Sequence, residues 1–207
     1  LNWSQAIKNL HLNEKKDNKS KSYRRIVFDE ICANFLSLSE NRKRIRKRKK
    51  AKVFDNQKAE YLIKKLPFKL TNSQNEVLKE INQDLLSDKR MFRIIQGDVG
   101  SGKTIVSLLS ICNVTQSGYQ AALMSPTEIL AKQHFELSKK IFGNLLKIRF
   151  YTGKTEYKER QNILKELKEG KIDLIIGTHS LFQKPIKFRN LGLTVIDEQH
   201  KFGVKQR

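Results

Sequence analysis

Short apolar runs alternate with segments of three- and four-residue periodicity from Pro67 onward. The periodic segments predict helices over 73–86, from about 103, over 127–142 and over 156–169. The apolar runs predict strands at Phe92–Ile95, Ala121–Met124, Ile148–Tyr151, Asp173–Ile176 and Leu193–Ile196. Strands that alternate with helices indicate βαβ units. We therefore expect an α/β fold with a parallel sheet flanked by helices on both faces.

The pattern before Pro67 is different. Residues 11–22 are polar and charged without periodicity, which predicts an exposed loop. From Tyr23 to about Leu66 the pattern is helical. One face of this segment carries apolar residues, namely Ile26, Val27, Ile31, Phe35 and Leu38. We therefore divide the chain into a helical linker segment over 1–66 and an α/β domain over 67–207.

The net charge of the chain indicates what kind of partner it binds. The 207 residues include 42 Lys and Arg against 21 Asp and Glu, a formal net charge of +21. This excess favours a polyanionic partner such as nucleic acid, although charged faces that only contact solvent would have the same composition. Eight of the nine residues in the run 42–50 are cationic. This run either follows a phosphate backbone, or is a solvated helix face or a targeting-like tract.

Several other classes of protein are disfavoured. Cys32 and Cys112 lie far apart and form no CxxC pair, so we expect neither a disulfide framework nor a zinc site, and a reducing cytosol fits. Apolar runs stay well short of the roughly 20 residues of a membrane span, so we expect no membrane partner.

The most specific motif follows the first predicted strand. The stretch QGDVGSGKT (96–104) fits the phosphate-binding pattern G-x-x-x-x-G-K-[ST] between an apolar strand and an apolar helix. Its glycines would let backbone N–H groups surround the phosphates, while Lys103 would reach the β- and γ-phosphates and Thr104 would bind Mg²⁺. The predicted nucleotide-binding residues are Gly97, Asp98, Val99, Gly100, Ser101, Gly102, Lys103 and Thr104.

Two acids end the last predicted strand. Groups at the carboxyl ends of parallel strands face the ligand crevice. There, Asp197 would hold Mg²⁺ and Glu198 would polarise the attacking water as general base. Together with the phosphate-binding loop, these acids predict a site that binds ATP and Mg²⁺, with Lys103, Asp197 and Glu198 as the catalytic residues.

Five segments occur in an order that resembles the superfamily 2 helicases, and most closely the RecG-type branched-DNA helicases. The segments are LPFKLTNSQ (66–74), QGDVGSGKT (96–104), MSPTEILAKQH (124–134), GTHSLFQ (177–183) and VIDEQHKFGVKQR (195–207). The resemblance extends over roughly 22–207. It implies that 67–207 is a P-loop NTPase domain of RecA-like fold. It also implies a helicase that remodels stalled forks and Holliday junctions in recombination and repair, using ATP.

The resemblance also implies further site residues. Gln74 would recognise the adenine edge, Phe68 would lie against the base, and Gln199 and His200 would couple the nucleotide site to DNA. The implied DNA contacts are Pro126, Thr127, Glu128, Thr152, Gly153, Gly177, Thr178 and His179. Ordinary strand-to-helix connections would use several of these residues in the same way; Thr127, for example, is a good helix N-cap.

Finally, the resemblance implies parts that the sequence does not contain. We expect a domain truncated at its C-terminal end, lacking a second RecA-like domain with its arginine fingers and a wedge domain. Alone, it should be nearly inactive. The expected location is the bacterial cytoplasm, with the nucleoid. Two alternatives stay open: a transcription-repair-coupling-type DNA translocase, whose carboxylate motif usually has the sequence DEEQ, and a non-motor, nucleotide-gated DNA-binding fragment.

Overall fold

The structure is a computed structural model that describes residues 1–12, 16–47, 54, 58–183 and 185–202, excluding the side chains of 16–20, 42, 44–47 and 58. The chain forms two compact units, residues 1–50 and residues 51–207.

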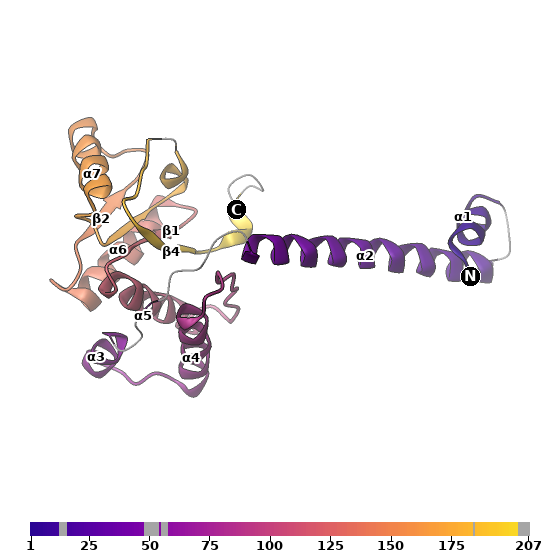
Figure 1. Cartoon of the computed structure of the whole chain (residues 1–207), viewed down its shortest axis with the longest axis horizontal. Coiled ribbons are helices and arrows are strands. Elements are labelled where there is room, and N and C mark those ends of the chain that lie inside the picture. Colours follow the sequence, from indigo (N-terminus) through magenta and orange to yellow (C-terminus); the bar gives the residue numbers. More distant parts are fainter. Residues whose placement is uncertain (13–15, 48–53, 55–57, 184, 203–207) are drawn as a thin grey trace. The chain divides into compact units, whose positions relative to one another are not determined.

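The first unit is a pair of helices, α1 (Trp3–His11) and α2 (Lys16–Lys47). Helix α1 packs against α2, and Ala6 and Ser22 are buried (Figure 1). The prediction of a loop over 11–22 was therefore wrong at residue 11 and from residue 16 onward, while 13–15 lie outside the described residues. Polar residues carry no periodic signal of their own, whereas a second helix packed alongside stabilises the first turns of α2.

The rest of α2 is largely exposed. Ile26 and Val27 are half-buried, but Ile31, Phe35 and Leu38 of the predicted apolar face are exposed. Within the basic run 42–50, Lys43 is the one residue whose side chain is described, and it is exposed. The interpretation of the run 42–50 as a phosphate contact, and the alternatives of a solvated helix face or a targeting-like tract, stay predictions. Among the described residues, no helix has both the length and the apolar character needed to cross a membrane.

The second unit contains a parallel sheet of four described strands in the order β2-β3-β1-β4. These are β1 (Gln120–Met124), β2 (Ile148–Tyr151), β3 (Leu174–Gly177) and β4 (Leu191–Ile196). The helices are α3 (Lys58–Lys65), α4 (Asn72–Leu86), α5 (Lys103–Gln116), α6 (Glu128–Phe142) and α7 (Tyr157–Glu169). Two short 3-10 helices are η1 (His179–Phe182) and η2 (Gln199–Lys201).

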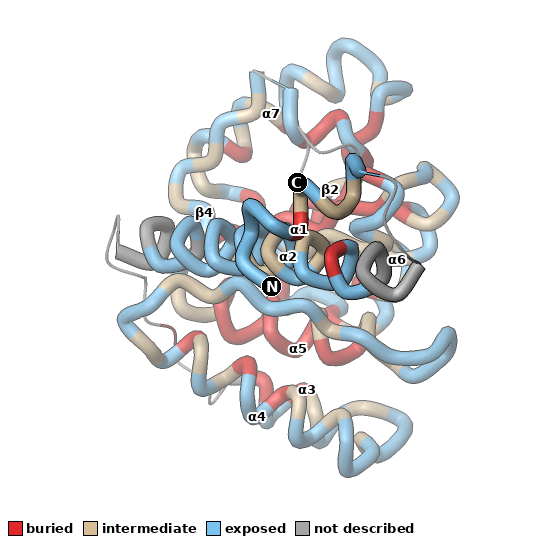
Figure 2. Tube along the Cα trace, turned by 90° about the vertical axis from the view of Figure 1, so that its right-hand side faces the viewer, coloured by how far each residue is buried: buried red, intermediate tan, exposed pale blue. Residues whose placement is uncertain are grey.

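Helices cover both faces of this sheet, as the pattern predicts. Successive residues of a strand point to opposite faces. Accordingly, Ala121 and Leu123 of β1 pack in the core with α5 and α6, whereas Ala122 and Met124 pack in the core with α7. The sheet lies between α5 and α7 in Figure 1, and α5 is largely buried in Figure 2. The α/β prediction is confirmed, with strand and helix limits shifted by at most two residues where both ends were predicted.

One predicted strand is wrong. Phe92–Ile95 leads into the phosphate-binding loop, but it pairs with none of the described strands. Phe92 and Ile94 are 63% and 75% exposed, whereas Met91 and Ile95 pack against the core. A strand needs a neighbouring backbone for its hydrogen bonds, and an apolar run alone does not supply one.

Helix α3 packs within the second unit, although the sequence pattern assigned it to the linker segment 1–66. The buried side chain of Asn113 on α5 accepts a hydrogen bond from the Ala59 N–H at 2.9 Å. It also donates to Asn82 of α4 at 3.1 Å. One buried amide therefore joins three helices. As functional divisions, the limits 1–66 and 67–207 stay a prediction.

A carboxylate on α7 ties this helix to the edge strand β2. Glu166 pairs with Arg149 at 3.0 Å and with Lys147 at 2.8 Å. The hydrogen bond from Arg149, and to a smaller extent the one from Lys147, hold the pKa of Glu166 below its ordinary value. We expect Glu166→Gln to lower the free energy of unfolding at neutral pH by about 1 kcal/mol.

The lowered pKa of Glu166 determines how this loss of unfolding free energy changes with pH. A depressed carboxyl pKa contributes stability above the unfolded-state pKa, about 4.3 for Glu, and this contribution is lost as pH falls through the folded-state pKa. In urea unfolding, the difference between wild type and variant should therefore shrink below about pH 4. Glu169→Gln, which removes an exposed pair between the last residue of α7 and Lys171 beyond it, is the control and should change less. Equal loss at all pH values would contradict an ion-pair origin.

Candidate functional site

The phosphate-binding loop has the backbone that its sequence predicts. Gly100 and Gly102 adopt positive φ angles of 84° and 81°, where residues with a Cβ are strained. Gly102 is the N-cap of α5 and makes no side-chain capping bond, so backbone N–H groups are presented at this helix N-terminus. A Cβ at Gly102 would collide with the amide nitrogen of Gln74. The loop has the backbone of an anion cradle.

The lysine of the loop folds back over it. Lys103 Nζ donates to the carbonyl oxygens of Gly97 at 2.7 Å and Asp98 at 2.6 Å. A bound phosphate would replace these two carbonyls as the partner of the ammonium group. Thr104 is half-buried in the first turn of α5, whereas Val99 at the loop tip is fully exposed. The residues present therefore fit a nucleotide polyphosphate.

Gln74 connects α4 to this loop. The side-chain Oε1 of Gln74 accepts from the backbone N–H of Thr71 at 3.0 Å, and the backbone N–H of Gln74 donates to Thr71 Oγ1. These two bonds form a capping box. The Nε2 of Gln74 donates to the carbonyl of Ser101 at 2.9 Å. Phe68, before this helix, is 46% exposed. Adenine recognition by these two residues stays a prediction, while the contact between Gln74 and the loop is a structural finding.

Asp197 leaves the end of β4 next to the loop. Its backbone N–H donates to the carbonyl of Met124 at 2.8 Å, which extends the ladder between β1 and β4. The hydrogen bond with His134, at 2.8 Å, is the main cause that lowers the pKa of the Asp197 carboxyl, against the effect of burial. The charge of Lys103 lowers this pKa further, so the ammonium lies within electrostatic reach of the carboxylate.

Glu198 has a strained backbone. Its φ of 50° and ψ of 48° make it the one described residue other than glycine with positive φ. Such conformations cost on the order of 1 kcal/mol and are common at active sites. His200, on η2 with Gln199, lies 3.4 Å from the Glu198 carboxylate. The predicted general base and one predicted coupling residue are therefore neighbours.

The loops predicted to contact DNA leave the same edge of the sheet. Met124, Tyr151 and Ile196 are joined into one row through Gly177, because Met124 pairs with Gly177 and Ile196, and Gly177 pairs with Tyr151. The segments beyond this row contain all the predicted DNA contacts apart from Gly177 itself, together with Asp197 and Glu198. The parallel sheet therefore brings together residues that are far apart in the sequence.

These predicted contacts differ in exposure. Thr127, Gly153 and His179 are exposed, and Pro126 and Glu128 are half-buried. Thr152 and Thr178 are buried, with their hydroxyls bonded to the Lys154 N–H and to Ser180 respectively. Thr127 caps α6 by accepting from Leu130 N–H at 3.3 Å. Contact of DNA with the two buried threonines would therefore involve their backbone.

An ion pair joins two of these loops. Lys154 Nζ lies 2.8 Å from the Glu128 carboxylate and holds the pKa of that carboxyl below its ordinary value. Lys154 and His134 were not among the residues predicted for this site. His134 ends the segment 124–134 and Lys154 follows Gly153. Spacing along the chain does not show that Lys154 meets Glu128 or that His134 meets Asp197.

The donor set suits a cation shared with a nucleotide. Among the described residues, no group of three or more His, Cys, Asp or Glu side chains is arranged to hold a metal ion alone. Mg²⁺ is usually bound through one or two protein ligands together with substrate phosphates. The predicted ligands Thr104 and Asp197 would be a set of this kind.

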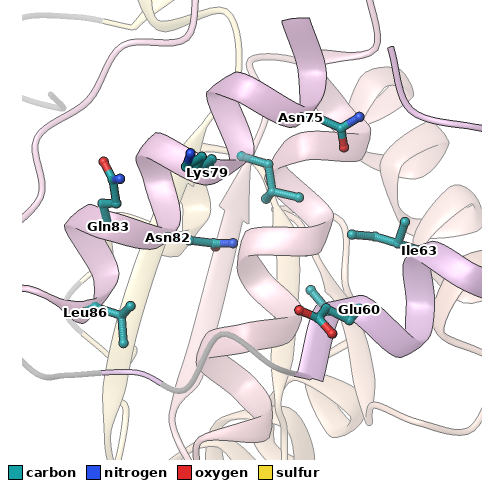
Figure 3. A pocket seen from close by; sticks show the side chains of 9 residues that line it. Glu60, Ile63, Asn75, Lys79, Asn82, Gln83 and Leu86 are labelled. Carbon is teal, nitrogen blue, oxygen red and sulfur yellow. The ribbon is translucent and has the colours of Figure 1, made fainter. Parts of the chain in front are cut away.

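A separate hollow of about 400 Å³ lies between α3 and α4 (Figure 3). Its lining includes Glu60 and Ile63 from α3, and Asn75, Lys79 and Gln83 from α4. None of the predicted site residues lines it, so it is not part of this site.

Comparisons with known proteins identify the family. Residues 71–207 match the DEAD/DEAH box helicase family. The chain is 44% identical to the ATP-dependent DNA helicase RecG of Aquifex aeolicus over 89% of its length, and 40% identical to that of Bacillus subtilis over 99%. It covers 24% and 30% of these two proteins, so it spans about a quarter of the relatives' length.

Solved structures show the same fold. A structure described as RecG bound to a three-way DNA junction matches 96% of this chain with a TM-score of 0.81 and 38% identity, and the chain covers 27% of it. A hypothetical ATP-dependent RNA helicase from Sulfolobus tokodaii matches 70% of the chain with a TM-score of 0.54 and 22% identity, a likeness of fold alone. The predicted RecA-like fold and the resemblance to RecG-type helicases are confirmed.

Proposed function

Because this chain belongs to the DEAD/DEAH box helicase family, we propose that it is the nucleotide-binding half of a RecG-type motor that remodels branched DNA with energy from ATP. The observation that carries the proposal is the shared sheet edge. Asp197 follows the end of β4 within electrostatic reach of Lys103, and the loops after β1, β2 and β3 leave the sheet at the same edge. Nucleotide and DNA would thus bind at the same edge of one sheet.

Each residue has a role that its position supports. The N–H groups at the start of α5 and Lys103 would bind the phosphates, and Thr104 with Asp197 would hold Mg²⁺. The bound cation would neutralise charge that develops on the phosphoryl oxygens. Glu198 would orient and polarise the attacking water, and Gln199 and His200 would transmit the state of the site toward DNA. Phe68 and Gln74 would hold the adenine.

The rest of the proposal concerns partners. Exposed Gly153 and His179 support a DNA backbone contact, and the relative solved with a three-way junction supports branched DNA as the substrate. A second RecA-like domain and a wedge domain would complete the motor, in the bacterial cytoplasm at the nucleoid. The RecG relatives favour this interpretation over a transcription-repair-coupling-type translocase or a non-motor binding fragment.

The test is the ATPase rate of the complete protein with branched, duplex and single-stranded DNA at one salt concentration. We expect branched DNA to stimulate hydrolysis most, because its arms engage more of the motor than a simple strand does. The salt concentration must be fixed, since phosphate contacts make DNA affinity strongly salt-dependent. Equal rates with all three DNAs would contradict the branched-DNA preference, and no DNA stimulation at all would contradict the motor.

A further inference from the structure

One side chain outside the predicted site contacts the metal-binding carboxylate. His134 lies on α6, 63 positions before Asp197 in the chain, and its Nε2 is 2.8 Å from Asp197 Oδ2. Its side chain is only 12% exposed, so the imidazole is held by its surroundings as well as by this bond. None of the roles derived above uses this histidine.

The contact leaves the rest of the carboxylate available. Asp197 has two oxygens, and His134 engages Oδ2. The side chain of Asp197 is still 33% exposed. A hydrogen bond to a largely buried imidazole restricts the rotation of this short side chain. A carboxylate held in this way presents its remaining lone pairs in a fixed direction.

We propose that His134 is a positioning residue that holds Asp197 in the orientation in which it binds the Mg²⁺ of the nucleotide. This inference rests on the proposed function, because it presupposes that Asp197 serves a magnesium–nucleotide complex. Carboxylates that bind metals are commonly oriented by a hydrogen-bonding neighbour of this kind, and loss of such a neighbour typically lowers metal affinity about 10- to 100-fold.

Helix α6 also connects His134 to the proposed DNA-binding edge. Helix α6 begins at Glu128, directly after the loop of Pro126 and Thr127, and Thr127 caps it. His134 lies about two helical turns further on. The hydrogen bond to Asp197 therefore links a helix that starts in one predicted DNA loop to the nucleotide site through a rigid element.

Three variants test the proposal. His134→Phe keeps most of the ring volume and removes the donor, and His134→Ala removes both. His134→Gln places an amide N–H donor at nearly the same reach as Nε2. The probe is a fluorescent ATP analogue bound to this 207-residue chain, titrated with Mg²⁺ and, separately, in excess EDTA. Thermal unfolding of each variant is measured alongside.

We expect the Phe and Ala variants to need about 10-fold or more Mg²⁺ for half-maximal tight binding. Their affinity for the analogue in EDTA should stay at the wild-type value, because Asp197 then has no metal to hold. The Gln variant should recover most of the Mg²⁺ dependence. A general loss of folding would lower binding in both conditions, so the ratio of the two affinities isolates positioning from stability.

Two results would overturn the inference alone. One is a wild-type Mg²⁺ dependence in the Phe or Ala variant; the other is a Gln variant as impaired as the Phe variant. A wild-type chain that binds the analogue neither with Mg²⁺ nor in EDTA would instead contradict the proposed function.

Discussion

Replacing Lys103 with alanine should abolish ATP hydrolysis by the complete protein and leave most of its DNA binding intact. The Lys103 ammonium lies over the loop, bonded to the Gly97 and Asp98 carbonyls that a phosphate would displace. Without it, one positive charge is lost where negative charge develops in the transition state. Removal of such a group costs about 10²- to 10³-fold in rate or more. DNA binding uses other loops, so its affinity should change little.

The measurement is steady-state ATPase with saturating branched DNA, together with DNA affinity in the absence of nucleotide. Lys171→Ala is the matched control, because it also removes a lysine but at the exposed end of α7, where its partner is Glu169. The control should hydrolyse ATP at the wild-type rate. A Lys103→Ala protein that retains wild-type turnover would exclude this loop as the phosphate site.

Gly177→Ala should destabilise the second unit by about 3 kcal/mol or more. A Cβ at this position would collide with the backbone carbonyl of Tyr151 on the paired strand β2 and would lie 3.2 Å from Leu181 Cγ. A backbone carbonyl cannot move aside as a flexible side chain can, so β2 and β3 would have to separate. Urea unfolding of this chain measures the loss directly.

Gly153→Ala is the matched control for this experiment. A Cβ at Gly153 would have no heavy atom within 4 Å, and its backbone needs no positive φ. Its unfolding free energy should stay within about 0.5 kcal/mol of wild type. The resemblance assigns both glycines to DNA contact, yet only Gly177 is required by packing within the chain. Similar losses in the two variants would contradict this distinction.

Local features of the site were predictable from sequence because their chemistry depends on neighbours along the chain. Gly102, Lys103 and Thr104 need a fixed spacing to surround a phosphate, and the amino-acid sequence shows that spacing directly. The capping box of Thr71 and Gln74 has the same local character. Apolar runs likewise marked the paired strands closely, since burial on both faces of a parallel sheet requires apolar residues at successive positions.

Features that depend on contacts between distant segments were not predictable in this way. The run Phe92–Ile95 has a strand's composition but pairs with none of the described strands. Helix α2 begins at Lys16 within a polar stretch, next to α1. Helix α3 belongs with α5 through the buried amide of Asn113. In each case packing against another segment, present or absent, decided the outcome.

The phosphate-binding loop, the two acids after the last strand and the alternation of strands and helices were thus determined by the sequence alone. Only the tertiary structure decided that Gln74 contacts the loop, that Lys154 meets Glu128, and that His134 contacts Asp197. The physical reason is that a motif is a pattern of neighbours along the chain. A hydrogen bond between residues 63 positions apart exists only once the sheet has placed α6 beside the end of β4.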